Sequence, residues 1–94
     1  MNKKIIQWVR ARNIHTAKPE KQFLKVIEEV GELADGLGKG DLHAIKDAVG
    51  DVYVTLVSLC ETLSIDMTEC VEQAYDEIKD RKGKLVDGVF IKEE

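Results

Sequence analysis

The residues most able to do chemistry in this chain are two groups of acids about twenty positions apart. The first group is the run Glu28-Glu29-Val30-Gly31-Glu32, and the second is the run Asp47-Ala48-Val49-Gly50-Asp51. Each residue of an α-helix advances about 100° around the axis, so the glutamates would span an arc of roughly 100° and the aspartates roughly 40°. Two helices would therefore each carry an acidic side.

Carboxylates from both helices, if they face one space, would repel one another, because like charges at short distance raise one another's pKa values. A divalent cation would remove this penalty. All the candidate ligands are oxygen atoms, with no histidine or cysteine at ligand spacing, which favours Mg²⁺ or Mn²⁺ over zinc. Because Mg²⁺ usually completes its coordination shell with water and substrate phosphates, phosphate chemistry is the predicted reaction class.

A solvated acidic surface is the alternative, since a polar side opposite an apolar stripe is typical of any surface helix. Two observations weigh against it. Asp51 precedes residues 52–60, which are apolar around most of the helix and must be enclosed, and a buried carboxylate needs a partner. Gly31 and Gly50 each cost about 1 kcal/mol relative to alanine inside a helix, a cost usually accepted where another backbone or a ligand comes close. Both interpretations stay open on the residues alone.

A basic cluster and two aromatic residues are candidates for binding the rest of a substrate. The cluster is Lys79, Arg81, Lys82 and Lys84. Arginine grips phosphate oxygens in a bidentate fork and lysine binds them as a point charge, although cations near a helix C-terminus also favour the helix dipole without any ligand. Trp8 and Tyr53 are candidates for stacking on a nucleobase, and the alternative for Trp8 is a role as a core or interface anchor.

Four helices must position these residues. Apolar periodicity predicts helices over residues 2–12, 19–37, 41–63 and 66–82, followed by a tail over 83–94. Pro19 suits the first turn of the second helix, and Asp41 and Asp66 are N-cap candidates for the third and fourth. The third segment is rich in β-branched residues, but its unbroken apolar period is far too long for a strand. The predicted fold class is therefore all-α, in a single domain over residues 1–94.

Two further expectations concern packing. The second helix carries an apolar stripe opposite the glutamates, and the fourth has a side that we expect to be buried, made of Val71, Ala74, Tyr75 and Ile78. In the tail, Asp87-Gly88 between short apolar runs indicates a hairpin or turn without a third strand, which would fold back or dock on a neighbouring subunit.

Composition limits the class of protein. The 94 residues are 44% hydrophobic and 34% charged, a balance typical of a folded, helix-rich domain near the size where a single core is marginal. The net charge of −4 argues against a general nucleic-acid binder. We see neither the apolar core of a signal peptide nor an 18-residue apolar run, so we expect no membrane segment and a cytoplasmic location. Cys60 and Cys70 show no zinc spacing and are expected to be reduced and packed.

The two acidic runs together resemble the all-α nucleoside triphosphate pyrophosphohydrolases of the MazG-like family, over nearly the whole chain. Residues 75–92 resemble the C-terminal segment of its small phage-type members. This resemblance implies a helical protomer that assembles into a homodimer or homotetramer and binds Mg²⁺. It would hydrolyse a nucleoside or deoxynucleoside triphosphate to the monophosphate and pyrophosphate.

The resemblance also implies roles for single residues. Glu29, Glu32 and Asp51 match the family's metal ligands, and Glu28 or Glu29 would orient the attacking water or accept its proton. The basic cluster would hold the distal phosphates. The family's remaining acid would fall at position 48, which is Ala48 here, so Asp47 is the candidate replacement. Ala48 also favours an alternative, a non-catalytic helical module that binds a nucleotide or a protein. A dimeric helical bundle without a ligand is a third interpretation.

Overall fold

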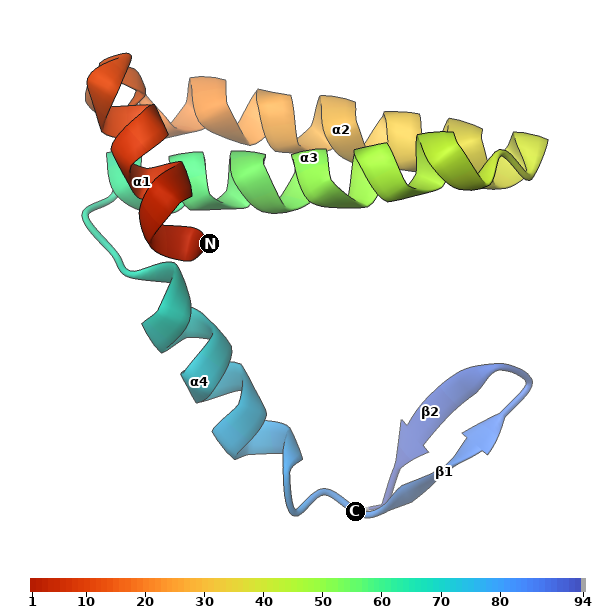
Figure 1. Ribbon diagram of the computed structural model, residues 1–94. Coiled ribbons are helices and arrows are strands. Elements are labelled where there is room, and N and C mark those ends of the chain that lie inside the picture. The colour runs from red at the N-terminus through yellow and green to blue at the C-terminus, as the bar shows by residue number, and fades with distance from the viewer. Residues whose placement is uncertain (94) are drawn as a thin grey trace.

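The computed structural model describes residues 1–93 and confirms the predicted all-α class, with four α-helices and a short C-terminal hairpin (Figure 1). The elements in chain order are α1 (Asn2–Ala11), the 3-10 turn η1 (Ile14–Thr16), α2 (Pro19–Lys39), α3 (Leu42–Thr62), α4 (Met67–Ile78), β1 (Gly83–Val86) and β2 (Val89–Lys92).

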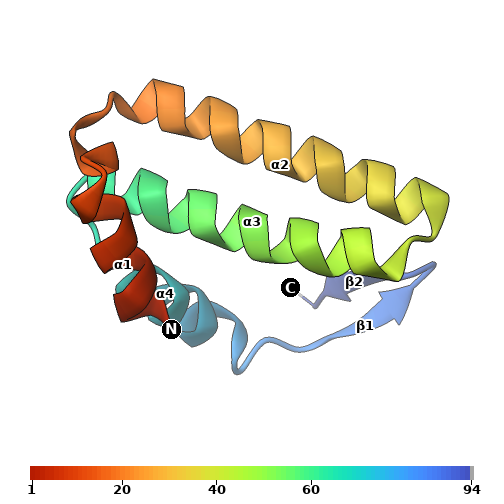
Figure 2. The same cartoon turned by 45° about the horizontal axis from the view of Figure 1, so that its top comes forward.

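Helices α2 and α3 form an antiparallel pair of 21 residues each, which we call the helix layer (Figure 2). Gly40 ends α2 with a positive φ of 65°, and Asp41 begins α3 by accepting a hydrogen bond of 3.1 Å from the backbone N–H of Ala44. Gly36 is buried where the helices meet, since a Cβ there would lie only 3.4 Å from the backbone nitrogen of Ile45. A Cβ at this position would make ordinary van der Waals contact with α3, so the two helices lie close together at this end.

Helix α1 covers the far end of α3 and completes the small core. Val9 and Val57 are fully buried, and Cys60 and Met67 lie with Val57 in one cluster. Arg10 donates from Nε to the Oε1 atom of Glu61 at 2.7 Å, and Glu61 is only 9% exposed. Because an unpaired charge at that depth is costly, this ion pair fixes α1 against α3.

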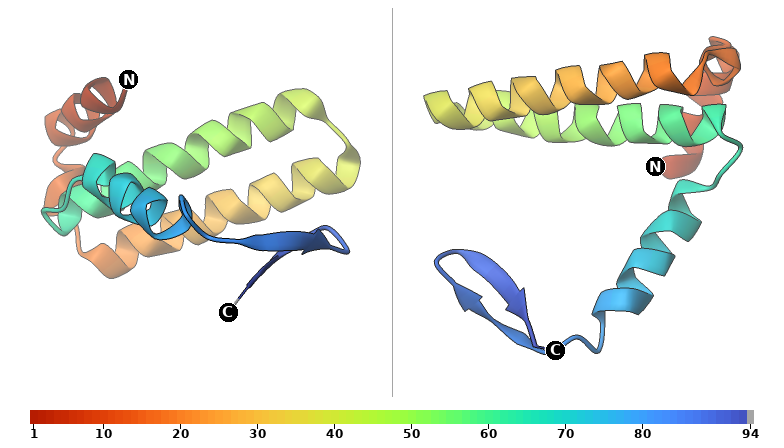
Figure 3. Two further views of the ribbon diagram at one scale, coloured as in Figure 1. Left: turned by 90° about the horizontal axis from the view of Figure 1, so that it is seen from below. Right: turned by 180° about the vertical axis from the view of Figure 1, so that it is seen from behind.

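Helix α4 and the hairpin project away from this body. Helix α4 is bent by 107° from α3, and Figure 3 shows the hairpin standing apart from the helix layer. In the hairpin, Val86 pairs with Val89 in an antiparallel register, and both Asp87 and Gly88 have positive φ. This is the turn geometry that Asp-Gly favours, so the predicted hairpin is confirmed.

Two sequence-based expectations about the fourth helix were wrong. Helix α4 ends at Ile78 rather than near residue 82, and Gly83 belongs to β1, where it leaves room for the ring of Phe90 on the opposite strand. The side expected to be buried, Val71, Ala74, Tyr75 and Ile78, is exposed within one copy. The physical reason is that α4 leaves the body at a steep angle instead of packing along it.

Among the described residues, no single helix is long and apolar enough to cross a membrane; α3 and α4 reach that length and composition only when counted together across their bend.

Candidate metal centre

The three glutamates of α2 form one compact group. One carboxylate oxygen from each of Glu28, Glu29 and Glu32 lies within 4.8 Å of the others. Glu29 is half-buried because it turns toward α3, while Glu28 and Glu32 are exposed. The grouping follows from the spacing of three and four residues, which puts side chains on adjacent turns of one helix face.

The aspartates of α3 lie at the two ends of this group. The charge of Asp51 acts on Glu29 across the gap between the helices, and Asp47 lines the same pocket as Glu32. This pairing follows from the antiparallel arrangement, because a residue later on α2 lies beside one earlier on α3. Both aspartates of α3 therefore lie beside the glutamate group of α2.

The surroundings of Glu29 disfavour its charged form. Burial raises its pKa above the ordinary value, and a hydrogen bond with Glu32 and the charges of Glu32, Asp51 and Glu28 raise it further. Its Oε2 atom is buried and has no hydrogen-bond partner. A buried, unpartnered carboxylate oxygen is unfavourable and requires a cation or a proton.

One nearby lysine offsets only part of this charge. Lys25 donates to the Oε2 atom of Glu28 at 3.1 Å, and this bond is the main reason why its pKa is raised. Within the described residues, no lysine or arginine forms an ion pair with Glu29, Glu32, Asp47 or Asp51. Sequence reasoning missed Lys25. Its spacing of three, four and seven residues before Glu28, Glu29 and Glu32 puts it on the same face of the helix and could have identified it.

The donor set fits a hard divalent cation. Every candidate ligand is a carboxylate oxygen, and the Oε2 atom of Glu29 is buried without a hydrogen-bond partner. Mg²⁺ and Mn²⁺ prefer such ligands. The group that lies within ligand distance is Glu28, Glu29 and Glu32, and Asp51 and Asp47 of α3 are the nearest further acids that would hold such an ion.

Position 48 differs in character from its neighbour. Ala48 is 4% exposed and Asp47 is exposed, and both line the pocket shared with Glu32. An acid at position 48 would enter this pocket from a nearly buried position. Asp47 is its exposed neighbour on the same pocket.

A mostly apolar pocket of about 420 Å³ lies between α1 and α3, beside the acids. Trp8 and Asp51 both line it, together with Lys4, Ile5 and Val54. The Arg12 guanidinium lies 4.3 Å from the centre of the Trp8 ring. Tyr53 is not among these lining residues; its hydroxyl donates to Asn2 Oδ1 at 3.4 Å. Lys4 is a second cation near the site that sequence reasoning missed, because only the fold brings α1 to Asp51.

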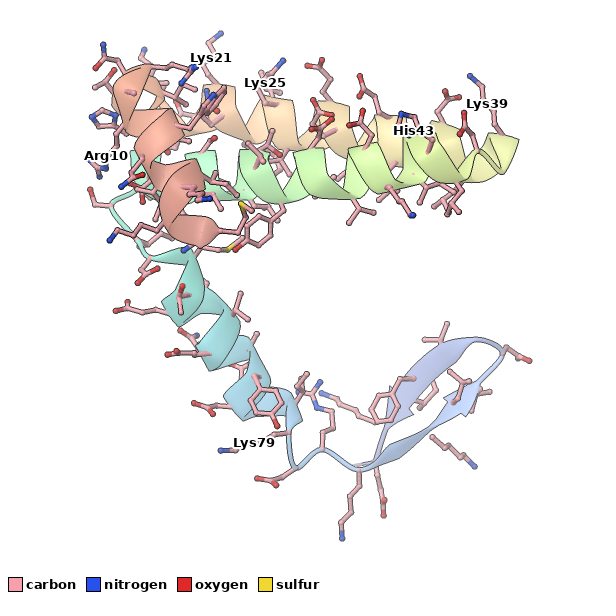
Figure 4. All side chains as sticks on the ribbon, in the orientation of Figure 1. Arg10, Lys21, Lys25, Lys39, His43 and Lys79 are labelled. Atoms are coloured by element: carbon pink, nitrogen blue, oxygen red, sulfur yellow. The ribbon has the colours of Figure 1, made fainter. Side chains whose placement is uncertain are left out.

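The basic cluster lies elsewhere in the same copy. Lys79 pairs with Asp76 at 3.4 Å, Arg81 and Lys82 line a pocket with Lys92 at the foot of the hairpin, and Lys84 is on β1. Figure 4 shows Lys79 far below the layer that carries Lys25 and Lys39. A single copy therefore does not bring these cations to the acids.

Comparison with known proteins defines the class. The family model of the MazG nucleotide pyrophosphohydrolase domain matches residues 17–86, which include both acidic runs and the whole basic cluster, so the chain belongs to this family. An uncharacterised 18.2 kDa protein from the rep-hol intergenic region of Haemophilus phage HP1 (strain HP1c1) is similar, with 43% identity over 65 residues. That match covers 68% of this chain but only 40% of the phage protein. No solved structure matches the chain.

We expect Glu29→Gln to stabilise the metal-free protein and to abolish stabilisation by Mg²⁺. The substitution removes a charge that is repelled by its neighbours, so Tm in EDTA should rise by about 2–6 °C for a domain of this size. A carboxyl with a raised folded pKa contributes stability below its unfolded pKa, and this contribution is lost as pH rises through the folded pKa. Stabilisation of the unsubstituted protein by Mg²⁺ should therefore be larger at pH 8 than at pH 5.

Thermal unfolding with EDTA or millimolar Mg²⁺ measures both effects. Glu20→Gln is the matched control, because Glu20 lies on the same helix in its first turn, outside the glutamate group. An unchanged response to Mg²⁺ in Glu29→Gln would remove Glu29 from the ligand set.

Proposed function

We propose that this protein hydrolyses a nucleoside or deoxynucleoside triphosphate to the monophosphate and pyrophosphate, using Mg²⁺ or Mn²⁺ held by the acids of the helix layer. Membership of the nucleotide pyrophosphohydrolase family supports the reaction class. The main support for a metal ion is the Oε2 atom of Glu29, which is buried and has no hydrogen-bond partner. Glu29 is flanked by Glu32 from its own helix and by Asp51 from the next.

The proposed roles follow from position. Glu29, Glu32, Asp51 and Asp47 would hold the metal, next to the place where the substrate phosphates would bind. When bound, the cation offsets the negative charge that develops on the phosphate oxygens and favours ionisation of the attacking water. Glu28 or Glu29 orients this water toward the α-phosphorus or accepts its proton. Glu28 lies at the exposed edge of the group, where its carboxylate is held by Lys25.

The pocket between α1 and α3 is the proposed place for the base. Asp51 lines this pocket and also faces Glu29, so it joins the phosphate site to the apolar pocket. Trp8 offers a flat apolar surface there, and stacking of a base on an aromatic ring contributes about 1–3 kcal/mol. Stacking tolerates any base, so Trp8 supports binding of nucleotides as a class.

A cytoplasmic location, where triphosphates are abundant, belongs to the same proposal, as does assembly into a homodimer or homotetramer.

A triphosphate screen tests this function. The purified protein is incubated with each common and each chemically damaged nucleoside triphosphate in millimolar Mg²⁺, and pyrophosphate and monophosphate are quantified. We expect equal amounts of both products from at least one substrate, and none in EDTA. Release of inorganic phosphate with a diphosphate product, or no product from any substrate, contradicts the proposal.

The second candidate is a non-catalytic module of the same fold that binds a nucleotide or a protein. The apolar residue at position 48 favours it, because it removes one acid from the buried part of the site. Saturable binding of a Mg²⁺–nucleotide complex without turnover would support this function. A ligand-free helical bundle is the third, and calorimetry decides it: such a bundle would show no saturable Mg²⁺ binding in the millimolar range or below.

A further inference from the structure

The two cysteines of the chain meet at the corner between α3 and α4 (Figure 1). Cys60 lies in the last turn of α3, and Cys70 lies one turn into α4. The side chain of Cys70 is within hydrogen-bonding reach of the Cys60 thiol. Both are free thiols, and Cys60 is packed as expected, at 8% exposed, whereas the expectation of a packed side chain was wrong for Cys70, which is exposed. A buried thiol and an accessible thiol therefore lie side by side.

Hydrogen bonds hold this corner in one shape. The backbone N–H of Ile65 donates to the carbonyl oxygen of Cys60 at 3.0 Å, and Ser64 between them has a positive φ of 56°. Asp66 then begins α4 by accepting a hydrogen bond of 2.9 Å from the backbone N–H of Thr68. The first turn of α4 is therefore fixed close to the last turn of α3.

Packing across the corner puts the two thiols on facing sides of their helices. Met67 lies in one buried cluster with Cys60 and Val57. Cys70 follows Met67 by three residues, so it lies on the same face of α4, about 4.5 Å further along the axis. The approach of the two sulfur atoms thus follows from the contact between Met67 and α3.

We propose that Cys60 and Cys70 are a redox-sensitive pair that forms a reversible disulfide in response to hydrogen peroxide and fixes α4 against α3. In a reducing compartment the pair rests as two thiols, and a disulfide that forms there is usually transient and redox-sensing. The bond would involve only the α3–α4 corner, and it is independent of the proposed hydrolysis.

The accessible thiol reacts first. Burial raises the pKa of the Cys60 thiol, and the neighbouring Cys70 raises it further, so Cys60 is the poorer nucleophile at neutral pH. The Cys70 thiolate attacks the peroxide: an S–O bond forms, the O–O bond breaks, and the released hydroxide takes up a proton as the first water. Cys70 is then a sulfenic acid.

The buried thiol resolves this intermediate. The sulfur of Cys60 attacks the sulfur of Cys70, so that the S–S bond forms and the S–O bond breaks. The hydroxide that leaves takes the thiol proton of Cys60 and becomes the second water. In total the two thiols lose two electrons, and one peroxide is reduced to two waters.

The disulfide would stiffen the link between α4 and the rest of the fold. Every described residue after Met67 is exposed within one copy, so few contacts set the direction of α4. One of them is a side-chain hydrogen bond of 3.3 Å from Asn2 to Thr68. A covalent bond between residues ten positions apart adds a fixed contact and also restricts the unfolded chain, so oxidation should raise Tm.

Titration of the full chain with hydrogen peroxide, followed by intact mass and free-thiol measurement, tests the bond. We expect one equivalent of peroxide to remove both thiols together, with a loss of about 2 Da per chain that dithiothreitol reverses. Peptide mapping without reductant should find Cys60 joined to Cys70. In Cys70→Ser, loss of the remaining thiol should be at least about tenfold slower. A sulfinic acid at Cys70 beside an unchanged Cys60, a disulfide between two chains, or no reaction overturns the proposal.

Thermal unfolding tests the stiffening. Tm of the oxidised wild type should rise by at least about 5 °C and return to its starting value in dithiothreitol. Cys70→Ser is the matched control, because it replaces one exposed polar group by another; its Tm should lie within about 2 °C of the reduced wild type and should not respond to peroxide. An oxidised wild type that contains the disulfide without a rise in Tm overturns the stiffening of the corner.

Discussion

Replacing Glu32 or Asp51 by alanine is expected to lower Mg²⁺-dependent pyrophosphate release at least about a thousandfold. Each substitution removes one oxygen ligand, from α2 in the first case and from α3 in the second. A thousandfold loss corresponds to about 4 kcal/mol of transition-state stabilisation, which is reasonable for an ion that both binds the phosphates and activates the water. Steady-state assays of pyrophosphate release over a range of Mg²⁺ concentrations measure the effect.

The protein should remain folded in both variants. Glu32 is exposed and Asp51 is half-buried within the acidic group, so removing either charge relieves repulsion rather than breaking an ion pair. Helicity by circular dichroism should be unchanged. Glu20→Ala, on α2 but outside the glutamate group, should keep full activity. Unchanged turnover in either Glu32→Ala or Asp51→Ala would rule out the ligand assignment.

Ala48→Glu, which puts an acid at the position where the resemblance to the family implies one, is expected to destabilise this chain by about 3–5 kcal/mol. Ala48 is 4% exposed and lines the pocket shared with Glu32 and Asp47, so a glutamate there puts a poorly hydrated charge beside other carboxylates. With a total stability of only about 5–15 kcal/mol for most domains, such a loss is severe. Urea unfolding in EDTA measures it.

Asp47→Ala is the matched comparison for this substitution. Asp47 is exposed and is not part of an ion pair, so its removal should change the free energy of unfolding by less than about 0.5 kcal/mol. It should nevertheless weaken Mg²⁺ binding, as measured by calorimetry. The opposite result would be a stable Ala48→Glu protein that binds Mg²⁺ more tightly, together with an Asp47→Ala protein whose affinity for Mg²⁺ is unchanged. That result would mean that Asp47 does not serve as the replacement acid.

The sequence was sufficient for everything that depends on helical periodicity. A repeat of 3.6 residues put Glu28, Glu29 and Glu32 in one group, and the positive φ preferred by Asp87-Gly88 fixed the hairpin turn. These features are local, because they depend on residues within one or two turns of the chain. The MazG resemblance was equally readable, since it lies in the acidic runs themselves.

Only the tertiary structure decided how these local pieces meet. The antiparallel contact of α2 and α3 brings Asp51 to Glu29 and Asp47 to Glu32, and it leaves Ala48 nearly buried and Asp47 exposed on one pocket. The crossing of α1 puts Trp8 and Lys4 beside Asp51, and the steep exit of α4 keeps the basic cluster away from the acids of its own copy. Periodicity gives the direction of a side chain around its own helix axis, but the neighbour it meets depends on packing between segments distant in the chain.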